Sequence, residues 1–240
     1  MRTIFITGAT GGLGRALCEC FSETPCRIGI HTYRQYSEGE KLRGALNAKG
    51  CDAALFSAHL GKATSVKKMF QDFLARCGTI DLLINNAGVR QDRLFPNIHP
   101  SDWNDQVSVN LSGVFYSMRE AGGIMQERGG GHIINVTSYA AYTGRIGQSA
   151  YTASKRGLIA LTQSAAREWG GASIQVNAVC PGYLPTPMTA GLKPKTIDRI
   201  IRENALGRPS TLKEISAFIR HLSEMKHVSG QVFNLDSRIG

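Results

Sequence analysis

Short apolar runs alternate with longer stretches of helical periodicity along the whole chain. The apolar runs predict strands at 2–7, 27–32, 52–57, 80–84, 131–137, 173–180 and 231–235. The intervening segments predict helices at 12–23, 37–49, 64–77, 101–128, 149–169, 196–204 and 211–224. Because strands alternate with helices, the chain should form βαβ units around a parallel sheet. The near-continuous apolarity of the strands indicates that helices cover both faces of this sheet.

No Pro/Ser-rich linker, internal repeat or low-complexity tract divides residues 1–240. We therefore expect a single doubly wound α/β domain. The predicted helix 101–128 contains Gly122-Gly123, and each glycine costs about 1 kcal/mol in a helix interior. The pair indicates either a kink or the close approach of another helix.

The composition is typical of a globular protein. The chain is 42% hydrophobic and 19% charged, which argues against disorder. Its apolar runs are too short to span a membrane, and the N-terminus leads into a strand without a secretory signal, so we expect a cytoplasmic protein. The six cysteines form no C-x-x-C pair and the six histidines have no ligand spacing. We expect reduced thiols and no metal site.

The formal net charge of +10 requires a nucleic-acid partner to be considered. No helix-turn-helix, zinc-finger or basic-arm pattern is present, and the lysines and arginines are spread along the chain. We therefore expect no nucleic-acid partner. Two interpretations of the charge stay open: an ordinary solvated surface, or a field that attracts an anionic substrate or protein.

A glycine-rich turn, residues 7–14 (TGATGGLG), follows the first predicted strand. Gly8, Gly12 and Gly14 remove side chains from this strand-to-helix turn, so a pyrophosphate can approach the N–H groups at the helix N-terminus. The spacing G-x-x-x-G-x-G differs from the G-x-G-x-x-G pattern. A plain glycine turn is the alternative, but the position between strand and helix favours dinucleotide binding.

The second predicted strand and the residues after it favour NADP over NAD. In dinucleotide folds an acidic residue about 20 positions beyond the glycines binds the ribose 2′-hydroxyl of NAD. Residues 27–34 contain no acid, and Arg34, at their end, can pair with a 2′-phosphate. The alternative for Arg34 is an exposed loop arginine. Residues 85–88 (NNAG) follow the fourth strand, where a carboxamide can brace the turn beside the cofactor.

Tyr151 and Lys155 lie four residues apart in a predicted helix, and therefore on one helix face. A free tyrosine has a pKa of about 10, and a nearby ammonium favours the phenolate. We therefore expect the pKa of Tyr151 to be lowered toward neutrality, which would make the phenol a general acid or base at cell pH. This spacing also occurs by chance on surface helices, so its meaning depends on the rest of the chain.

Together these motifs resemble the short-chain dehydrogenase/reductase family over essentially the whole chain. The resemblance rests on the order of residues 7–14, 85–88, Asn110, Ser138, Tyr151-x-x-x-Lys155, and Pro181-Gly182 with Thr186. Segments 85–94, 103–105 and 149–168 are most similar to 3-oxoacyl-acyl-carrier-protein reductases. The resemblance implies a Rossmann fold with seven parallel strands in the order 3-2-1-4-5-6-7 and helices on both faces.

The resemblance also implies the catalytic roles. Tyr151 would protonate the substrate carbonyl oxygen, Ser138 would orient that carbonyl, and Lys155 would hold the nicotinamide ribose. Asn110 would hold a water of the proton relay. The alternatives are that Ser138 is a strand-end hydroxyl and Asn110 a kink residue in a helix. The residues implied for NADP(H) binding are Thr7, Gly8, Gly12, Leu13, Gly14, Arg34, His59, Leu60, Asn86, Ala87, Gly88, Tyr151, Lys155, Pro181, Gly182 and Thr186.

Several positions depart from the family pattern. His59 stands where an aspartate usually contacts adenine, and Gly11 stands where NADP-linked members often have a basic residue. Arg34, and less directly Arg15, would then hold the phosphate. The chain ends in residues 235–240 (LDSRIG), where relatives commonly have Asp-Gly-Gly and a longer tail.

The resemblance implies a carbonyl substrate on an acyl carrier protein, and a homotetramer. Arg128 and Arg156 could dock the carrier, although Ala172 is not basic where relatives have arginine. A substrate lid is expected near 188–208. Cations expected near the substrate opening could form a basic rim or be ordinary solvated side chains; these are Arg90, Arg93, Arg145, Lys193, Lys195, Arg199, Arg202 and Arg208.

Three other functions stay open. The first is a ketoreductase or alcohol dehydrogenase for a sugar, polyketide or steroid. The second is a non-catalytic cofactor-binding sensor, which would not need the proton relay. The third is nucleic-acid binding driven by charge.

Overall fold

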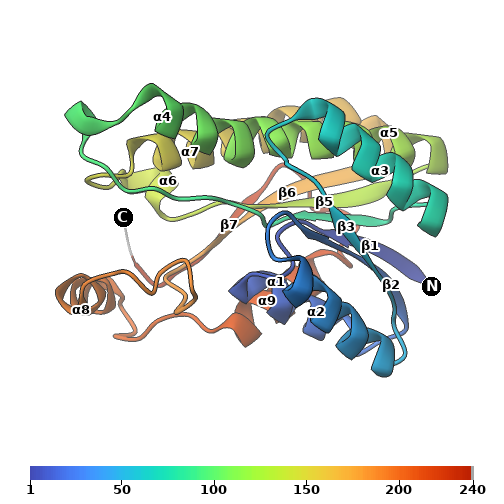
Figure 1. Ribbon diagram of the computed structural model, residues 1–240, viewed down its shortest axis with the longest axis horizontal. Coiled ribbons are helices and arrows are strands. Elements are labelled where there is room, and N and C mark those ends of the chain that lie inside the picture. The colour runs from blue at the N-terminus through green and yellow to red at the C-terminus, as the bar shows by residue number, and fades with distance from the viewer. Residues whose placement is uncertain (239–240) are drawn as a thin grey trace.

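The computed structural model describes residues 1–238 and contains one parallel sheet (Figure 1). Its strands are β1 (Arg2–Ile6), β2 (Cys26–Thr32), β3 (Asp52–Ser57), β4 (Leu82–Asn85), β5 (Gly131–Val136), β6 (Ile174–Pro181) and β7 (Val232–Leu235). They lie in the order β3-β2-β1-β4-β5-β6-β7 and all pair in parallel, so the predicted fold and strand order are confirmed.

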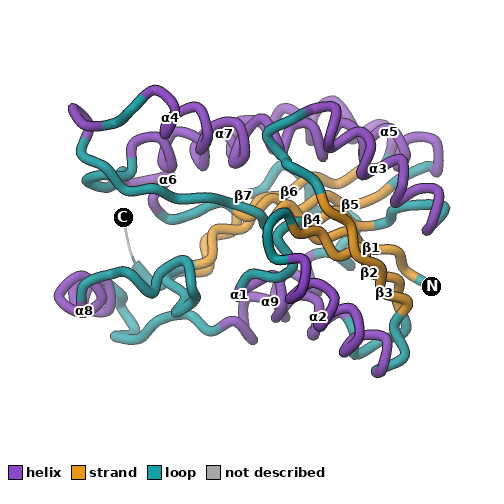
Figure 2. The backbone as a smooth tube through the Cα atoms, in the orientation of Figure 1, coloured by secondary structure: helices purple, strands orange, loops and turns teal. Residues whose placement is uncertain are grey.

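Helices cover both faces of the sheet (Figure 2). One layer holds α1 (Gly12–Phe21), α2 (Tyr36–Ala48) and α9 (Leu212–Leu222). The other holds α3 (Ala63–Cys77), α4 (Pro100–Val107), α5 (Gly113–Arg128) and α7 (Ser149–Trp169). Successive residues of β1 face opposite layers, as the period of a strand requires. Ile4 and Ile6 pack in the first core and Phe5 in the second.

The predicted helix 101–128 is interrupted, but not at its glycines. Residues Ser108–Ser112 form one π-helical turn between α4 and α5. Gly122 remains helical, and a Cβ there would lie 2.8 Å from the indole ring of Trp169. The expected close approach therefore comes from α7 of the same chain. Gly123 has no neighbour within 4 Å of a Cβ position.

The segment between β6 and α9 extends beyond the sheet. It contains α8 (Pro194–Glu203), which lies apart from the other helices in Figure 1. Ile200 of α8 is buried, whereas most residues around it are exposed. This segment includes the region predicted as a lid, and its mobility stays a prediction. A short helix that the sequence did not indicate, α6 (Ala140–Thr143), follows β5.

Candidate active site

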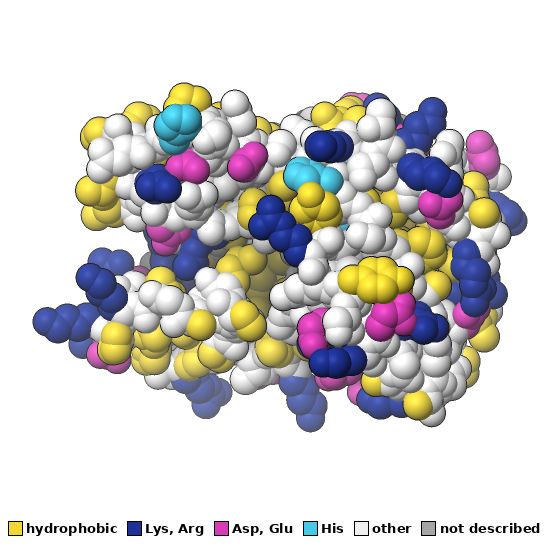
Figure 3. All heavy atoms as spheres, in the orientation of Figure 1, with side chains coloured by type: hydrophobic (Ala, Val, Ile, Leu, Met, Phe, Trp, Pro, Cys, Tyr) yellow, Lys and Arg dark blue, Asp and Glu magenta, His cyan; other side chains and the backbone are white. Residues whose placement is uncertain are grey.

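The carboxyl ends of the strands open into one cavity of about 850 Å³. Figure 3 shows this face hollowed between the two helix layers, with Lys and Arg side chains around the opening. The predicted site residues that line the cavity are Gly8, Gly12, Leu13, Arg34, His59, Leu60, Asn86, Ala87, Gly88, Ser138, Tyr151, Lys155, Pro181, Gly182 and Thr186. Thr7, Gly14 and Asn110 do not line it, and their contacts lie behind its wall.

Thr7 joins the two turns that form one side of the cavity. Its hydroxyl accepts hydrogen bonds from the backbone N–H groups of Asn86 and Ala87, each at 3.0 Å. The Asn86 amide in turn donates to the carbonyl oxygens of Thr7 and Gly8 at 3.0 and 3.1 Å. The Thr7 hydroxyl therefore braces the two turns, and its predicted contact with the cofactor stays a prediction.

The glycines at two of the predicted positions are required by close packing. Gly8 has a φ of 63°, in the left-handed region, and a Cβ there would lie 2.8 Å from Ala87 Cα. A Cβ on Gly14 would overlap the Gly8 carbonyl oxygen, so Gly14 permits the turn to pack closely on α1, and its predicted role in cofactor binding stays a prediction. No residue of the first turn of α1 is acidic, and no side chain caps that helix. Its free N–H groups suit an anion.

His31, at the end of β2, fixes the glycine turn, and sequence reasoning missed it. Its Nδ1 accepts from the Gly8 N–H at 3.1 Å, and its Nε2 lies 3.1 Å from the Ala58 carbonyl oxygen. These partners require the proton on Nε2. The ring is 2% exposed, and burial lowers the pKa of His31 to about 4, so it is neutral at pH 7. A lone histidine in an apolar strand was its only sequence signal.

Arg34 lies at the end of the cavity beyond the glycine turn. It is exposed, forms no ion pair among residues 1–238, and stacks over the Tyr33 ring at 5.5 Å. Tyr33 packs edge-on against His59, with ring centroids 4.8 Å apart. Arg15, the other predicted phosphate ligand, forms an ion pair with Glu38 at 2.7 Å. Of the two arginines, Arg34 is the one with an uncompensated charge.

Lys155 is buried beside Tyr151. Its Nζ donates to the Val136 carbonyl oxygen at 2.8 Å and lies 5.9 Å from the centroid of the Tyr151 ring. Burial lowers the pKa of Lys155 to about 8. The pKa of Tyr151 is raised, because burial outweighs the opposing contributions of Ser138 and Arg90. The expected lowering of the tyrosine pKa is therefore wrong for this structure, and the phenol is protonated at neutral pH.

Asn110 lies in the π turn and is completely buried. Its Oδ1 accepts from the Val89 N–H and its Nδ2 donates to the Val89 carbonyl, each at 2.8 Å. Nδ2 also lies 3.3 Å from Ser154 Oγ. The interruption of the helix turns this amide toward residues 88–89, beside Lys155. The structure assigns Asn110 a positioning contact, and its water relay stays a prediction.

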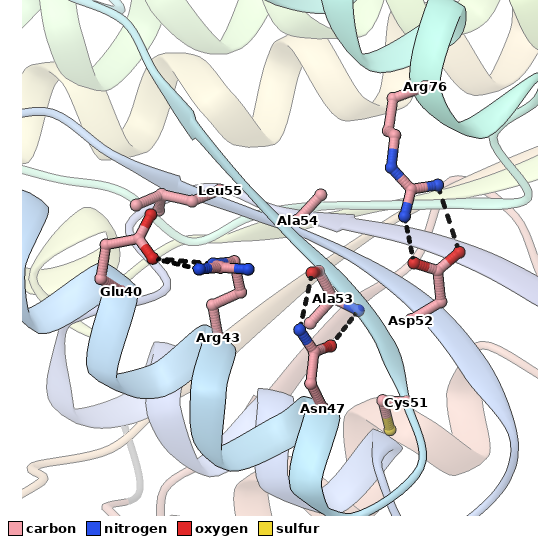
Figure 4. A pocket seen from close by; sticks show the side chains of 9 residues that line it. All are labelled: Glu40, Arg43, Asn47, Cys51, Asp52, Ala53, Ala54, Leu55 and Arg76. Atoms are coloured by element: carbon pink, nitrogen blue, oxygen red, sulfur yellow. Dashed lines mark hydrogen bonds and ion pairs between the residues drawn. The ribbon is translucent and has the colours of Figure 1, made fainter.

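A second hollow, of about 580 Å³, lies against the edge strand β3 (Figure 4). Its charges are already paired, Glu40 with Arg43 at 2.6 Å and Asp52 with Arg76 at 2.5 Å. The Asn47 side-chain amide donates to the carbonyl oxygen of Ala53 in β3 and accepts a hydrogen bond from the N–H of the same residue. These contacts protect a sheet edge, and no uncompensated group there suggests chemistry.

A family model described as short chain dehydrogenase matches residues 2–197. The chain belongs to the short-chain dehydrogenase/reductase family. The 3-oxoacyl-acyl-carrier-protein reductase FabG of Staphylococcus aureus (strain Mu50) is 30% identical over 237 residues, which cover 98% of this chain and 96% of that protein. Nodulation protein G of Rhizobium sp. (strain N33) is 34% identical over 237 residues, covering 98% and 95%.

Solved structures show the same architecture for this short-chain dehydrogenase/reductase. The crystal structure of a putative short-chain alcohol dehydrogenase from Sinorhizobium meliloti 1021 superimposes with a TM-score of 0.93 at 27% identity, covering 98% of this chain and 95% of that one. Among residues 1–238, no helix has the length and apolarity that crossing a bilayer requires, and no three His, Cys, Asp or Glu side chains gather in a metal-binding arrangement.

Proposed function

We propose that this short-chain dehydrogenase/reductase uses NADPH to reduce a 3-oxoacyl thioester to the 3-hydroxyacyl form. One observation carries the proposal: Tyr151, Ser138 and Lys155 line the same cavity as the glycine turn and Arg34. The candidate proton donor and the candidate dinucleotide site therefore lie in the same cavity. The thioester is favoured because 3-oxoacyl-acyl-carrier-protein reductases are among the relatives that match over almost the whole chain.

The residues present fit the cofactor. The uncapped start of α1 suits the pyrophosphate, and Arg34 suits a 2′-phosphate because it is exposed at the cavity and forms no ion pair among residues 1–238. His59 and Leu60 would bound the adenine, Lys155 would hold the nicotinamide ribose, and residues 181–186 would hold the carboxamide. When bound, the reduced nicotinamide supplies the hydride for the carbonyl carbon.

The chain's own residues supply the proton. The raised pKa keeps Tyr151 protonated at neutral pH, so its hydroxyl can donate to an oxygen that gains negative charge during reduction. Ser138, from the end of β5, lines the cavity with it and would orient the same oxygen. The Lys155 ammonium would stabilise the resulting phenolate, and reprotonation would pass through Lys155 and the region of Asn110.

The second candidate is reduction of another small carbonyl compound. It is favoured by the similarity to the putative short-chain alcohol dehydrogenase from Sinorhizobium meliloti 1021, at a TM-score of 0.93. A non-catalytic sensor is less favoured, because a sensor does not require the buried Lys155 and Asn110 contacts. The carrier protein as partner, the homotetramer and the cytoplasmic location stay predictions. Of the predicted docking arginines, both exposed, Arg128 donates to the Gly78 carbonyl and Arg156 stacks over Tyr142.

The test is NADPH oxidation with acetoacetyl thioester, comparing wild type with Tyr151→Phe. Loss of the phenol should reduce kcat by roughly a hundredfold or more, while NADPH binding is retained. Full activity in the variant would contradict the mechanism. If wild type ignores thioesters but reduces another ketone, the substrate assignment fails and the second candidate replaces it.

A further inference from the structure

Arg238, just beyond β7, is a charged residue with only 5% of its surface exposed. Its Nε donates to both carboxylate oxygens of Asp236 at 2.9 Å, and its Nη2 also bonds that carboxylate. The guanidinium carbon lies 3.9 Å from the centroid of the Tyr139 ring. Asp236 and Tyr139 thus fix the orientation of the guanidinium. Its Nη1 is buried and has no hydrogen-bond partner among residues 1–238.

This guanidinium borders the catalytic cavity. Arg238 and Tyr139 line the same cavity as Tyr151 and Ser138. Tyr139 is also the neighbour of Ser138 in the chain, so the arginine stacks on the residue next to the one that would orient the substrate carbonyl. Arg238 lies in the C-terminal segment where relatives commonly have Asp-Gly-Gly.

A second arginine makes this end of the cavity positive. Arg145 lines the cavity, is half-buried, and forms no ion pair among residues 1–238. Burial and the nearby Arg238 lower its pKa, which indicates that the two cations share one region. Asp236 compensates Arg238, and Arg199 pairs with Glu203 at 3.6 Å. Arg145 therefore leaves one positive charge in excess.

We propose that Arg145 and Arg238 bind a carboxylate of the substrate, within a few bonds of the carbonyl that Tyr151 protonates. A carboxylate would balance the excess charge and could pair with the two guanidinium groups that line the cavity. Guanidinium groups match carboxylates in geometry. The inference rests on the proposed carbonyl reduction but not on the thioester: it narrows the substrate to oxo compounds whose chain bears a free carboxylate, which acetoacetyl thioester lacks.

The test compares ketones that differ only in this charge. The probes are acetoacetate and levulinate, each against its methyl ester, with NADPH. Of the two acids, one should be the better substrate. For that acid, the wild-type kcat/KM should exceed the value for its methyl ester by ten- to a hundredfold, the usual range for a hydrogen-bonded charged group. Arg145→Gln should reduce that preference toward one, because kcat/KM falls more for the acid than for its ester. The matched charge control is Arg167→Gln, at an exposed arginine of α7 that forms no ion pair within the described residues 1–238.

Arg238 needs a pair of variants, because Arg238→Gln strands the Asp236 carboxylate and could unfold the chain. The double variant Asp236→Asn with Arg238→Gln removes both charges together. It should fold, as its Tm would show, and lose the acid preference. Arg238→Lys, which keeps the charge but not the planar fork, should retain part of it.

The outcomes separate this inference from the proposed function. Equal rates for acids and esters in wild type would overturn the carboxylate subsite while leaving carbonyl reduction intact. Reduction of acids without thioesters would overturn the thioester substrate alone. If no probe is reduced, binding of each acid and ester to the Tyr151→Phe variant with NADPH, measured by calorimetry, decides. No preference for the acids there would also overturn the subsite.

Discussion

The side-chain amide of Asn110 forms two hydrogen bonds of 2.8 Å with the backbone N–H and C=O of Val89. The π turn makes this possible, because its extra residue rotates Asn110 out of the helical register. The amide thereby ties α4 and α5 to the loop that borders Lys155. The same double contact occurs far from the cavity, where the Asn47 amide bonds the backbone of Ala53.

These two amides give a matched pair of variants. Asn110→Ala leaves the partly buried N–H and C=O groups of Val89 without these partners and should cost about 1–3 kcal/mol of unfolding free energy. It should also lower kcat, because the loop beside Lys155 loses its anchor. Asn47→Ala, at an exposed position, should cost less stability and leave kcat unchanged. Urea denaturation and steady-state NADPH oxidation measure both. Equal kcat in the two variants would remove the positioning role of Asn110.

The lowered pKa of Lys155 predicts that the rate of reduction falls on the alkaline side of its pH profile. Burial lowers its pKa from 10.5 to about 8, so the ammonium loses its proton as pH rises through about 8. The rate of reduction should then fall, because the neutral amine no longer stabilises the Tyr151 phenolate. The pKa of Tyr151 itself is raised, so its titration cannot produce this limb. Lys155→Arg should be slower but should lose the limb near pH 8. An unchanged limb in that variant would assign it to another group.

The buried histidines predict how stability depends on pH. Burial lowers the pKa of His31 and of His132 to about 4, whereas an unfolded histidine titrates at about 6.5. The stability they contribute is complete above pH 6.5 and is lost as pH falls toward 4, because only the unfolded chain binds the protons. From pH 7 to 5 the unfolding free energy should fall by about 2 kcal/mol per histidine.

Substitution separates the contribution of one histidine from the rest. His31→Gln should remove about half of the loss between pH 7 and 5, and His227→Gln, at an exposed position, is the control. The pKa of Asp52 is lowered by Arg27, so that carboxylate loses its stabilising contribution only below this pH window. Urea titrations at both pH values measure the effect. An identical loss in wild type and His31→Gln would contradict it.

The position of Arg34 predicts a preference for NADPH over NADH. If its uncompensated charge holds the 2′-phosphate, Arg34→Gln should raise KM for NADPH about tenfold or more and leave KM for NADH unchanged. Arg15→Gln should have a smaller effect, because Glu38 already pairs with Arg15 at 2.7 Å. Steady-state kinetics with both cofactors would measure the two variants. A parallel rise in KM for NADH would indicate a general disturbance of the cavity instead.

The parts predictable from sequence were those that depend on local spacing. The alternation of strands and helices gave the sheet, and the four-residue spacing placed Tyr151 and Lys155 on one helix that lines the cavity. The contacts that were missed join residues distant in sequence. His31 of β2 accepts a hydrogen bond from Gly8, which follows the neighbouring strand β1. Arg238, almost 100 residues further along the chain, stacks on the Tyr139 ring. No local pattern encodes such pairs, because each depends on how the strands are ordered.

The direction of the Tyr151 pKa was wrong for a related reason. Spacing revealed the neighbouring ammonium but not the depth of burial, which opposes ionisation of both groups. Burial depends on packing of the whole domain, which a four-residue motif does not contain.

Gly122 and Gly123 provide a prediction about stability in adjacent positions of α5. Gly123→Ala should raise the unfolding free energy by about 0.5–1 kcal/mol, because the site is open and alanine favours the helix. Gly122→Ala should lower it by about 1–3 kcal/mol, because the methyl group would lie 2.8 Å from the Trp169 ring. The double variant Gly122→Ala with Trp169→Leu should recover much of this loss, since the smaller side chain removes the overlap. Urea denaturation of the four proteins measures the contrast. If Gly122→Ala were as stabilising as Gly123→Ala, the glycine would not be serving the approach of α7, and contact with a second subunit would have to be sought there.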